Sequence, residues 1–371
     1  MLIEAVVPFG ESGSTGSAAD EGPSRVVRGS VAAASHRLAS LGVDGLVAEE
    51  TKDSPFTVLA AAAEATDSIR LSTSVAIAFA RSPAVAALDA WTLQRVSGGR
   101  FTLGLGSQIR QHIERRYGMP WSDPAPRMRE YVLAVRSLWS RWQEGEGPGF
   151  VGDHYRSDLM VPLFDPGPVD HPRIPVHLAA VNPLMCRVAG EVADGIRCHP
   201  ACTSGYIGQT LLPEARRSAA RAGRDPAQFE VAVKPLIAYA VGPESLEHAI
   251  RQVRSRLAFY AATPVYRPAF AHHGDAEVAD AARVLARERR WSELPGLIDD
   301  EFLDRYAFVG TPERVGARLV ECFGPLATRC EIPVASDEAA LTALPRLLTA
   351  IRAIRTDRRV RTDPEEYRDD R

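Results

Sequence analysis

The chain has 371 residues, of which 45% are hydrophobic and 25% are charged, an ordinary globular composition with enough apolar material for a large core. Its 44 basic and 47 acidic residues give a formal net charge of −3, and this balance argues against a nucleic-acid-binding protein. No apolar run reaches the roughly 18 residues of a transmembrane helix, and the N-terminus lacks the basic region of a secretory signal. The sequence therefore predicts a cytoplasmic protein that binds neither nucleic acid nor membrane.

The five cysteines do not form a recognisable disulfide or metal framework. An odd number cannot pair completely within one chain, and a protein of this size does not need disulfides to fold. The densest group, Cys198, His199 and Cys202, offers three ligands without the second paired cluster that is usual in structural zinc sites. We therefore expect reduced thiols and no metal.

Eight short β-rich runs follow one another along the chain. Most are continuous apolar stretches rather than alternating ones, as expected for parallel strands that helices cover. The runs begin at Leu2, Gly45, Arg70, Phe101, Pro175, Gly195, Phe229 and Arg329.

Helical segments rich in Ala, Arg, Leu and Glu lie between these runs. Two of them close at Gly42 and Gly99, which suit a helix C-cap. Four helix starts carry a capping residue directly before proline: Ser54-Pro55, Ser82-Pro83, Asn182-Pro183 and Thr311-Pro312. Repeated strand, short loop and capped helix predict an α/β protein with a (β/α)8 TIM barrel, whose functional residues should lie at the carboxyl ends of the strands.

Three insertions interrupt this pattern within a single barrel domain spanning residues 1–355. Residues 10–23 form a Gly/Ser/acidic loop after the first strand, on the predicted active-site side. Residues 145–173 contain FVGDHYRSDLM, which could form a small hairpin, and residues 263–305 contain the helix-like ADAARVLARERRW without strands. Long insertions of this kind commonly form lids or binding loops. Residues 356–371 form a strongly charged tail that we expect to fray.

The glycine-rich segment 104–108 ends the fourth run. A dinucleotide-binding fingerprint would need glycine or alanine where Ile109 stands, and it would follow the first strand, so the segment argues against a Rossmann site. Its glycines would let a ligand approach the backbone, and Ser107 could cap the next helix. The simpler alternative is a barrel strand that needs small residues at its mouth.

Two groups of charged residues lie beside predicted strand ends. Adjacent strand residues point to opposite faces, so at most one of Glu49 and Glu50 faces the barrel mouth, as a proton donor or an orienting group. Both could instead be solvated or ion-paired. His112 and its neighbouring arginines suit an anion, although such a run is more often a solvated helix face.

These segments resemble the luciferase-like monooxygenase superfamily, in particular its branch dependent on the deazaflavin coenzyme F420. The resemblance spans roughly residues 30–355 without the insertions, and its most specific part runs from Ser82 to Trp121. It is carried by LGVDGLVAEETKDSPF, LSTSVAIAFARSPAVAALDAWTLQRVSGGRFTLGLGSQIRQHIERRYGMPW, FVGDHY, IPVHLAAVNPLMCRVAGEVADGIRCH and VGTPERVGARL.

The resemblance implies a barrel with the cofactor ring across the strand ends. A non-proline cis peptide at Ser74-Val75 would form a bulge behind the ring, and Ser107, Gln108 and His112 would contact the cofactor tail. The turn before Pro183 would bind its phosphate through backbone N–H groups. The cofactor-binding residues implied in this way are Glu49, Ser74, Val75, Ile77, Gly106, Ser107, Gln108, His112, Ala179, Ala180, Val181 and Asn182.

The chain departs from the sugar-phosphate and alcohol dehydrogenases of this family. They have Asp-His where this chain has Glu49-Glu50, an acidic residue where Ile109 stands, and lysines that have no clear counterpart here. We therefore predict an F420-dependent oxidoreductase that moves hydride to or from a small organic or peptide-derived substrate, favouring reduction of an activated C=C or C=N bond. Glu50 is the first candidate for the proton-transfer group, and His112 is the second.

Two alternatives remain open at this point. The first is an FMN-dependent monooxygenase of the same fold that receives reduced flavin from a partner reductase. The second is a non-catalytic cofactor-binding barrel. A homodimer and a monomer are both compatible with the sequence.

Overall fold

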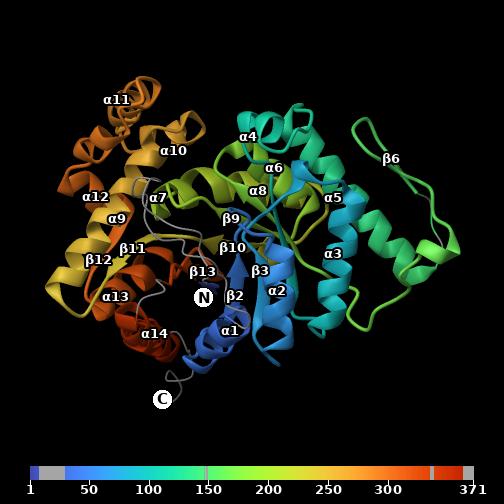
Figure 1. The fold of residues 1–371 in the computed structure, drawn as a ribbon, viewed down its shortest axis with the longest axis horizontal. Coiled ribbons are helices and arrows are strands. Elements are labelled where there is room, and N and C mark those ends of the chain that lie inside the picture. The colour runs from blue at the N-terminus through green and yellow to red at the C-terminus, as the bar shows by residue number, and fades with distance from the viewer. Residues whose placement is uncertain (8–29, 146, 148, 335–337, 362–371) are drawn as a thin grey trace, which may run out of the picture.

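The computed structural model describes residues 1–7, 30–145, 147, 149–334 and 338–361 (Figure 1). The predicted insertion at residues 10–23 lies outside these ranges, and so does most of the predicted charged tail. The tail is described only as far as Arg361, where the last helix ends. None of the described helices combines the length and the apolar character needed to cross a bilayer.

Eight parallel strands close into a barrel at the centre of the molecule (Figure 1). The circuit runs in the order β3-β2-β1-β13-β10-β9-β8-β5, and pairing between β5 and β3 closes it. In β1, Ile3 is in register with Cys330 of β13, and Ala5 is in register with Leu46 of β2. The barrel strands are β1 (Leu2–Val6), β2 (Gly45–Ala48), β3 (Arg70–Thr73), β5 (Phe101–Gly106), β8 (Val176–Ala180), β9 (Gly195–Cys198), β10 (Glu230–Val233) and β13 (Arg329–Ile332).

Each of the eight β-rich runs supplies one of these strands, which confirms the predicted (β/α)8 barrel. Two runs are broken. The run from Arg70 continues past a short interruption as β4 (Ala76–Ile77), which also pairs with β5. The run from Phe229, predicted as one strand, leaves the barrel at Pro235, which has no N–H for the ladder. It continues as β11 (Leu236–Tyr239), which pairs in parallel with β12 (Ala307–Gly310), a strand that was not predicted.

Helices surround the barrel in the expected alternation (Figure 1). All four predicted Xaa-Pro starts occupy the N-cap and first helical positions, but only Ser82 and Thr311 accept a backbone N–H through the side chain, from Val85 and Arg314. The helices are α1 (Ser30–Ser40), α2 (Pro55–Glu64), α3 (Pro83–Val96), α4 (Arg110–Arg115), α5 (Pro124–Glu144), α6 (Pro183–Val192), α7 (Ser204–Tyr206), α8 (Leu212–Arg221), α9 (Pro243–Ala261), α10 (Arg267–Ala271), α11 (Ala276–Arg287), α12 (Asp300–Tyr306), α13 (Pro312–Phe323) and α14 (Glu338–Arg361).

The two described insertions have different positions. The predicted hairpin forms from β6 (Phe150–Val151) and β7 (Arg156–Ser157), which pair antiparallel at the edge of the molecule, away from the barrel strands (Figure 1). Residues 263–305 are free of strands, as predicted, and fold with α9 into a helical cap, which we define as residues 243–306. The cap has its own apolar core, which includes Leu257, Phe270 and Phe302 and packs against β11 and β12.

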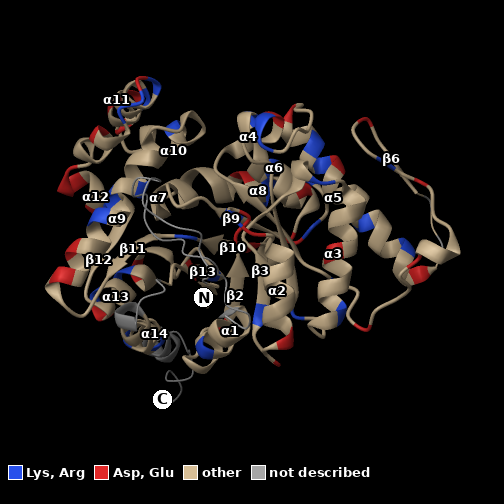
Figure 2. Cartoon of the chain, viewed as in Figure 1, with Lys and Arg blue, Asp and Glu red and all other residues tan. Residues whose placement is uncertain are grey.

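In the view of Figure 2, positions of Lys and Arg are interspersed with positions of Asp and Glu along the outer helices. The more unusual charges lie inside the barrel. Glu4, Arg197, Arg329 and Glu331 are each at most 4% exposed, although they stand in otherwise apolar strands. A buried charge of this kind persists only when it is paired. These four side chains accordingly form ion pairs with one another inside the barrel.

Candidate active site

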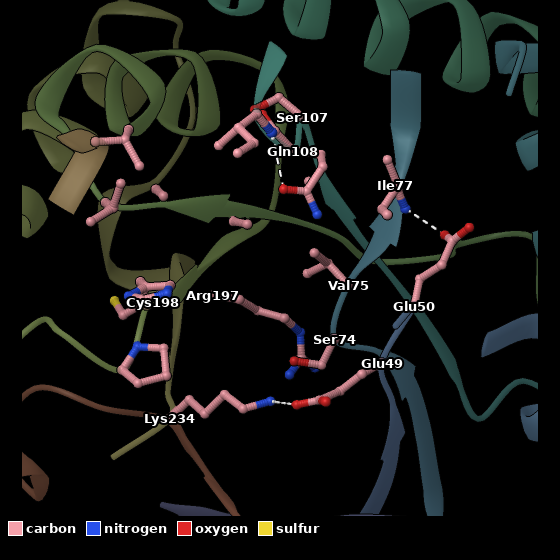
Figure 3. Close-up of a pocket in the computed structure, with 18 of the residues that line it drawn as sticks. Glu49, Glu50, Ser74, Val75, Ile77, Ser107, Gln108, Arg197, Cys198 and Lys234 are labelled. Carbon is pink, nitrogen blue, oxygen red and sulfur yellow. Dashed lines mark hydrogen bonds and ion pairs between the residues drawn. The ribbon is translucent and has the colours of Figure 1, made fainter. Parts of the chain in front are cut away.

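A cavity of about 360 Å³ opens where six barrel strands end (Figure 3). This is the face on which barrels of this type place their functional residues, and the volume is that of a small-molecule site. Its lining residues are Glu49, Glu50, Thr51, Ser74, Val75, Ile77, Gly106, Ser107, Gln108, Ile109, Ala179, Ala180, Val181, Arg197, Cys198, His199, Pro200, Lys234, Tyr260, Val265 and Tyr266.

All of the residues predicted to form the site line this cavity except His112 and Asn182. Their assembly from β2, the β3–β4 bulge, β5 and β8 agrees with the predicted position of the site. What each of them binds stays a prediction.

The peptide bond between Ser74 and Val75 is cis, as predicted from the resemblance. It lies in the break between β3 and β4 and places Val75 in the cavity wall (Figure 3). Beside it, Thr73 Oγ1 donates to the carbonyl oxygen of Gly104 at 2.7 Å and accepts the Gly104 N–H at 2.8 Å. A Cβ at position 104 would lie 2.0 Å from Thr73 O, so this close approach of β3 and β5 requires glycine.

Glu50 holds the far side of the bulge. Its Oε2 accepts the N–H of Ile77 at 2.6 Å and Arg81 Nη1 at 2.8 Å, while its Oε1 accepts Arg81 Nη2 at 2.5 Å. The side chain is only 10% exposed. Both oxygens are thus occupied, which matches the alternative in which this carboxylate is ion-paired. Its role in proton transfer stays a prediction.

Glu49 faces the barrel interior and contacts Lys234 (Figure 3). The ammonium of Lys234 also contacts Glu331. Ser74 Oγ donates to the other oxygen of Glu331. The charge of Lys234 lowers the pKa of Glu49 against the opposing effect of burial. Burial lowers the pKa of Lys234, but the carboxylates of Glu331 and Glu49 outweigh it and raise that pKa overall. This group of four side chains forms the charged floor of the cavity.

Arg197, which also lines the cavity, connects this floor to the deeper charges of Glu4 and Arg329. Arg197 Nη1 contacts Glu4 Oε2 at 3.0 Å and Glu331 Oε2 at 3.3 Å, and its Nη2 donates to Ser72 Oγ at 2.5 Å. Arg329 holds the other oxygen of Glu4 at 2.8 Å. Burial alone would raise the pKa of Glu4, but the two guanidinium groups lower it overall. The floor is therefore anchored from below by charges that cannot easily move.

His199 and two tyrosines form the wall on the cap side. The imidazole stacks on Tyr266, with ring centroids 3.7 Å apart at 21°, and meets the edge of Tyr260 at 4.6 Å and 72°. Burial, reinforced by the nearby charge of Lys234, lowers the pKa of His199 to about 3. The residue before it, Cys198, is a buried thiol whose pKa burial raises, so it is unreactive.

At the site, two predicted side-chain roles are wrong. Ser107 does not cap the following helix, because Ile109 occupies the N-cap of α4 and Ser107 Oγ instead donates to Gln108 O at 3.2 Å. Asn182 occupies the N-cap of α6, but its side chain does not accept a helix N–H. Its Nδ2 donates to Val265 O at 3.2 Å and so ties α6 to the cap.

His112 is exposed on α4 and does not line the cavity. Within the described ranges, no group of three or more His, Cys, Asp or Glu residues could hold a metal ion. All five cysteines are free thiols.

The residues that sequence reasoning missed are Arg197, His199, Lys234 and the tyrosines of the cap. One signal could have found the first three: charged or titratable residues at alternate positions of apolar β-runs, as in GIRCH and FEVAVK. Alternate residues share a face, so these side chains had to face the barrel interior. The tyrosines lack such a signal, because Tyr260 lies in α9 and Tyr266 lies in the insertion, and the sequence does not specify how these two segments pack.

Comparison with known proteins agrees with this architecture. Residues 6–329 match the family described as luciferase-like monooxygenase. An uncharacterised protein of Mycobacterium tuberculosis is 39% identical over 309 residues, covering 83% of this chain and 88% of the relative. A second protein of that organism, assigned by name to the coenzyme F420-dependent oxidoreductases, is 31% identical and covers 72% of this chain and 80% of the relative.

A solved structure shares the fold. The coenzyme F420-dependent tetrahydromethanopterin reductase of Methanopyrus kandleri superposes with a TM-score of 0.73 at 19% identity, covering 95% of this chain and 98% of that one. Since the family match spans most of the barrel and a relative above 30% identity spans most of the chain, the protein belongs to the luciferase-like monooxygenase family.

Proposed function

We propose that the protein is a coenzyme F420-dependent oxidoreductase that reduces a small organic substrate at an activated C=C or C=N bond. The observation that carries the proposal is the wall formed by the cis Ser74-Val75 bulge, Gly106 and Ala179 beside the strand ends. The relative assigned by name to F420-dependent oxidoreductases supports the choice of cofactor.

The cavity fits a planar ring. Val75, Gly106, Ala179 and Ala180 are small or apolar and leave backbone accessible along one wall. A Cβ at position 106 would lie 2.6 Å from Val75 Cγ2 and 3.5 Å from Ala179 Cβ. Any side chain at this position would therefore displace Val75, and only glycine is compatible with the wall as it stands. Such a surface suits face-to-face contact with a ring.

The start of α6 fits an anionic tail. Pro183 occupies the first helical position, and the next N–H groups have no carbonyl within the helix to bond. The helix has ten residues, and the backbone donors at its N-terminus can bind a phosphate group without the help of lysine side chains. This would leave the cations of the cavity floor free of any contact with the cofactor phosphate.

When bound, the deazaflavin supplies or accepts the hydride. The protein's own contribution is twofold. Glu50, through Arg81 and the Ile77 N–H, fixes the bulge against which the ring would lie. The cap would keep water from the reacting atoms. Sugar-phosphate oxidation is disfavoured because Lys234, the lysine of the cavity, is already held by Glu49 and Glu331.

The test is a titration of the purified protein with F420, followed by the change in the visible absorbance of the deazaflavin. We expect saturable binding and an affinity at least tenfold lower for Gly106→Ala, whose Cβ would displace Val75. Gly296→Ala is the matched control, because a Cβ there meets no atom within 4 Å.

Each outcome separates the candidates. Tight binding of FMN without binding of F420 would overturn the proposal in favour of a flavin monooxygenase. Binding of F420 without hydride transfer to any activated alkene or imine would point to a non-catalytic barrel. Equal affinity of Gly106→Ala and the wild type would place the ring elsewhere.

A further inference from the structure

One polar group at the cavity wall has no part in the function proposed above. His199 follows β9 directly, two residues after Arg197, so both side chains lie on the inner face of the strand. It lines the cavity from the cap side. The two tyrosine rings that pack on its imidazole fix the orientation of the ring. Orientation of this kind is what a positioned donor needs.

The hydrogen bond at Nδ1 of the imidazole defines its tautomer. The Ala201 N–H donates to His199 Nδ1 at 3.2 Å, so Nδ1 is an acceptor and the proton of the neutral ring is on Nε2. Within the described part of the chain, Nε2 has no hydrogen-bond partner. The depressed pKa of His199 keeps the ring neutral at physiological pH. The imidazole of His199 therefore gives the wall an N–H donor that carries no charge.

The charges that line the cavity are already neutralised. Glu49 contacts Lys234, Glu50 contacts Arg81, and Arg197 contacts Glu4 and Glu331. A charged substrate would have to leave water without gaining a counter-ion of its own. Pro200, Val265 and the ring of Tyr266 complete the same wall.

Building on the proposed function, we propose that His199 selects the substrate: its Nε2–H donates a hydrogen bond to the carbonyl oxygen or imine nitrogen of a small, flat, uncharged conjugated molecule. Hydride delivery to the far end of the conjugated double bond shifts an electron pair onto that oxygen or nitrogen, and a solvent proton completes the reduction. The hydrogen bond strengthens as negative charge develops there, and a neutral imidazole is suited to this role.

Two substitutions at this position separate donation from packing. His199→Gln keeps an N–H donor near the place of Nε2 but loses the aromatic stack on Tyr266. His199→Phe keeps the stack but has no donor. His36→Phe is the control, because His36 is exposed on α1. The probes are benzylideneacetone, a neutral enone, and cinnamate, its carboxylate analogue.

We expect the wild type to bind the enone at least tenfold more tightly than cinnamate. His199→Gln should stay within about fivefold of the wild type in enone affinity and in kcat/KM with reduced F420. His199→Phe should lose at least thirtyfold in kcat/KM while its F420 affinity is unchanged. In protein carrying ¹⁵N-labelled histidine, the His199 spectrum should show a protonated Nε2 whose signal shifts when the enone is added.

The opposite order, with His199→Phe active and His199→Gln impaired, would mean that the ring only packs, and would overturn the inference. A protonated Nδ1, tighter binding of cinnamate than of the enone, or failure of the wild type to bind the enone would overturn it as well. Failure of the proposed function is recognised separately, because enone binding and the histidine spectrum are measured without F420.

Discussion

The charged floor makes a strong prediction for Lys234→Met. The substitution keeps the length of the side chain but leaves the carboxylates of Glu49 and Glu331 without their shared cation. Removing one partner of a buried ion pair costs about 3–5 kcal/mol. Glu49 is 31% exposed and can be rehydrated in part, which places the expected loss near the lower limit, at about 3 kcal/mol.

The assay is urea unfolding of the full chain. With a slope of about 3 kcal/mol per molar urea, the midpoint should fall by about 1 M. Arg156→Met is the control, because Arg156 pairs with Asp158 at the surface of the hairpin, where such pairs contribute little. Its midpoint should equal that of the wild type.

The same variant predicts a pH dependence. The folded pKa of Glu49 is depressed, so its contribution is present above the unfolded value of about 4.5 and is lost as the pH falls through the folded pKa. The folded pKa of Lys234 is raised, so its contribution is complete below about 10.5 and is lost at higher pH. The difference between variant and wild type should therefore be largest between roughly pH 5 and 10. A difference as large at pH 3 as at pH 7, or an equal loss in Arg156→Met, would refute the reasoning.

Two further variants test the frame of the site. Glu50→Gln separates the predicted proton-transfer role from a structural one. A loss of rate of about 10²-fold or more at full cofactor affinity is expected if Glu50 transfers the proton. Lower thermal stability and F420 affinity with an unchanged pH–rate profile would mean that Glu50 only holds Arg81 and the Ile77 N–H. Gly190→Ala would place a Cβ 2.1 Å from Ala215 O and 2.9 Å from Ala219 N where α6 crosses α8. We expect a loss of about 3 kcal/mol in unfolding free energy, measured against Gly296→Ala, and equal midpoints of the two would contradict this packing.

The barrel could be predicted because its signal is local. Strands covered on both faces need continuous apolar runs, and each Xaa-Pro start marks the next helix. The strand β12 (Ala307–Gly310) was not predicted, since it follows an insertion and is not part of one of the β-rich runs, and its partner among the described strands is β11. The departure of β11 from the barrel likewise depends on its pairing with β12, which only the tertiary structure brings beside it.

The site was predictable where it is made of contiguous segments. Ser74-Val75 and the residues from Gly106 to Gln108 each lie within one short stretch, and the resemblance could assign them. Lys234 and Glu331 are far apart in sequence, and only the closure of the barrel brings their side chains together. His199 depends in addition on Tyr266, which belongs to the insertion, so neither its orientation nor its protonation could be inferred from the strand alone.

The split of one β-run between two sheets has a consequence for how such a site can diversify. The barrel ends supply the wall beside the cis peptide, whereas Tyr260, Val265 and Tyr266 come from one continuous stretch of the cap, which has a hydrophobic core of its own. Replacing that stretch exchanges one side of the cavity without altering a barrel strand. A barrel with this arrangement can acquire a new substrate range by recombination or drift in a single segment, while the opposite wall stays unchanged.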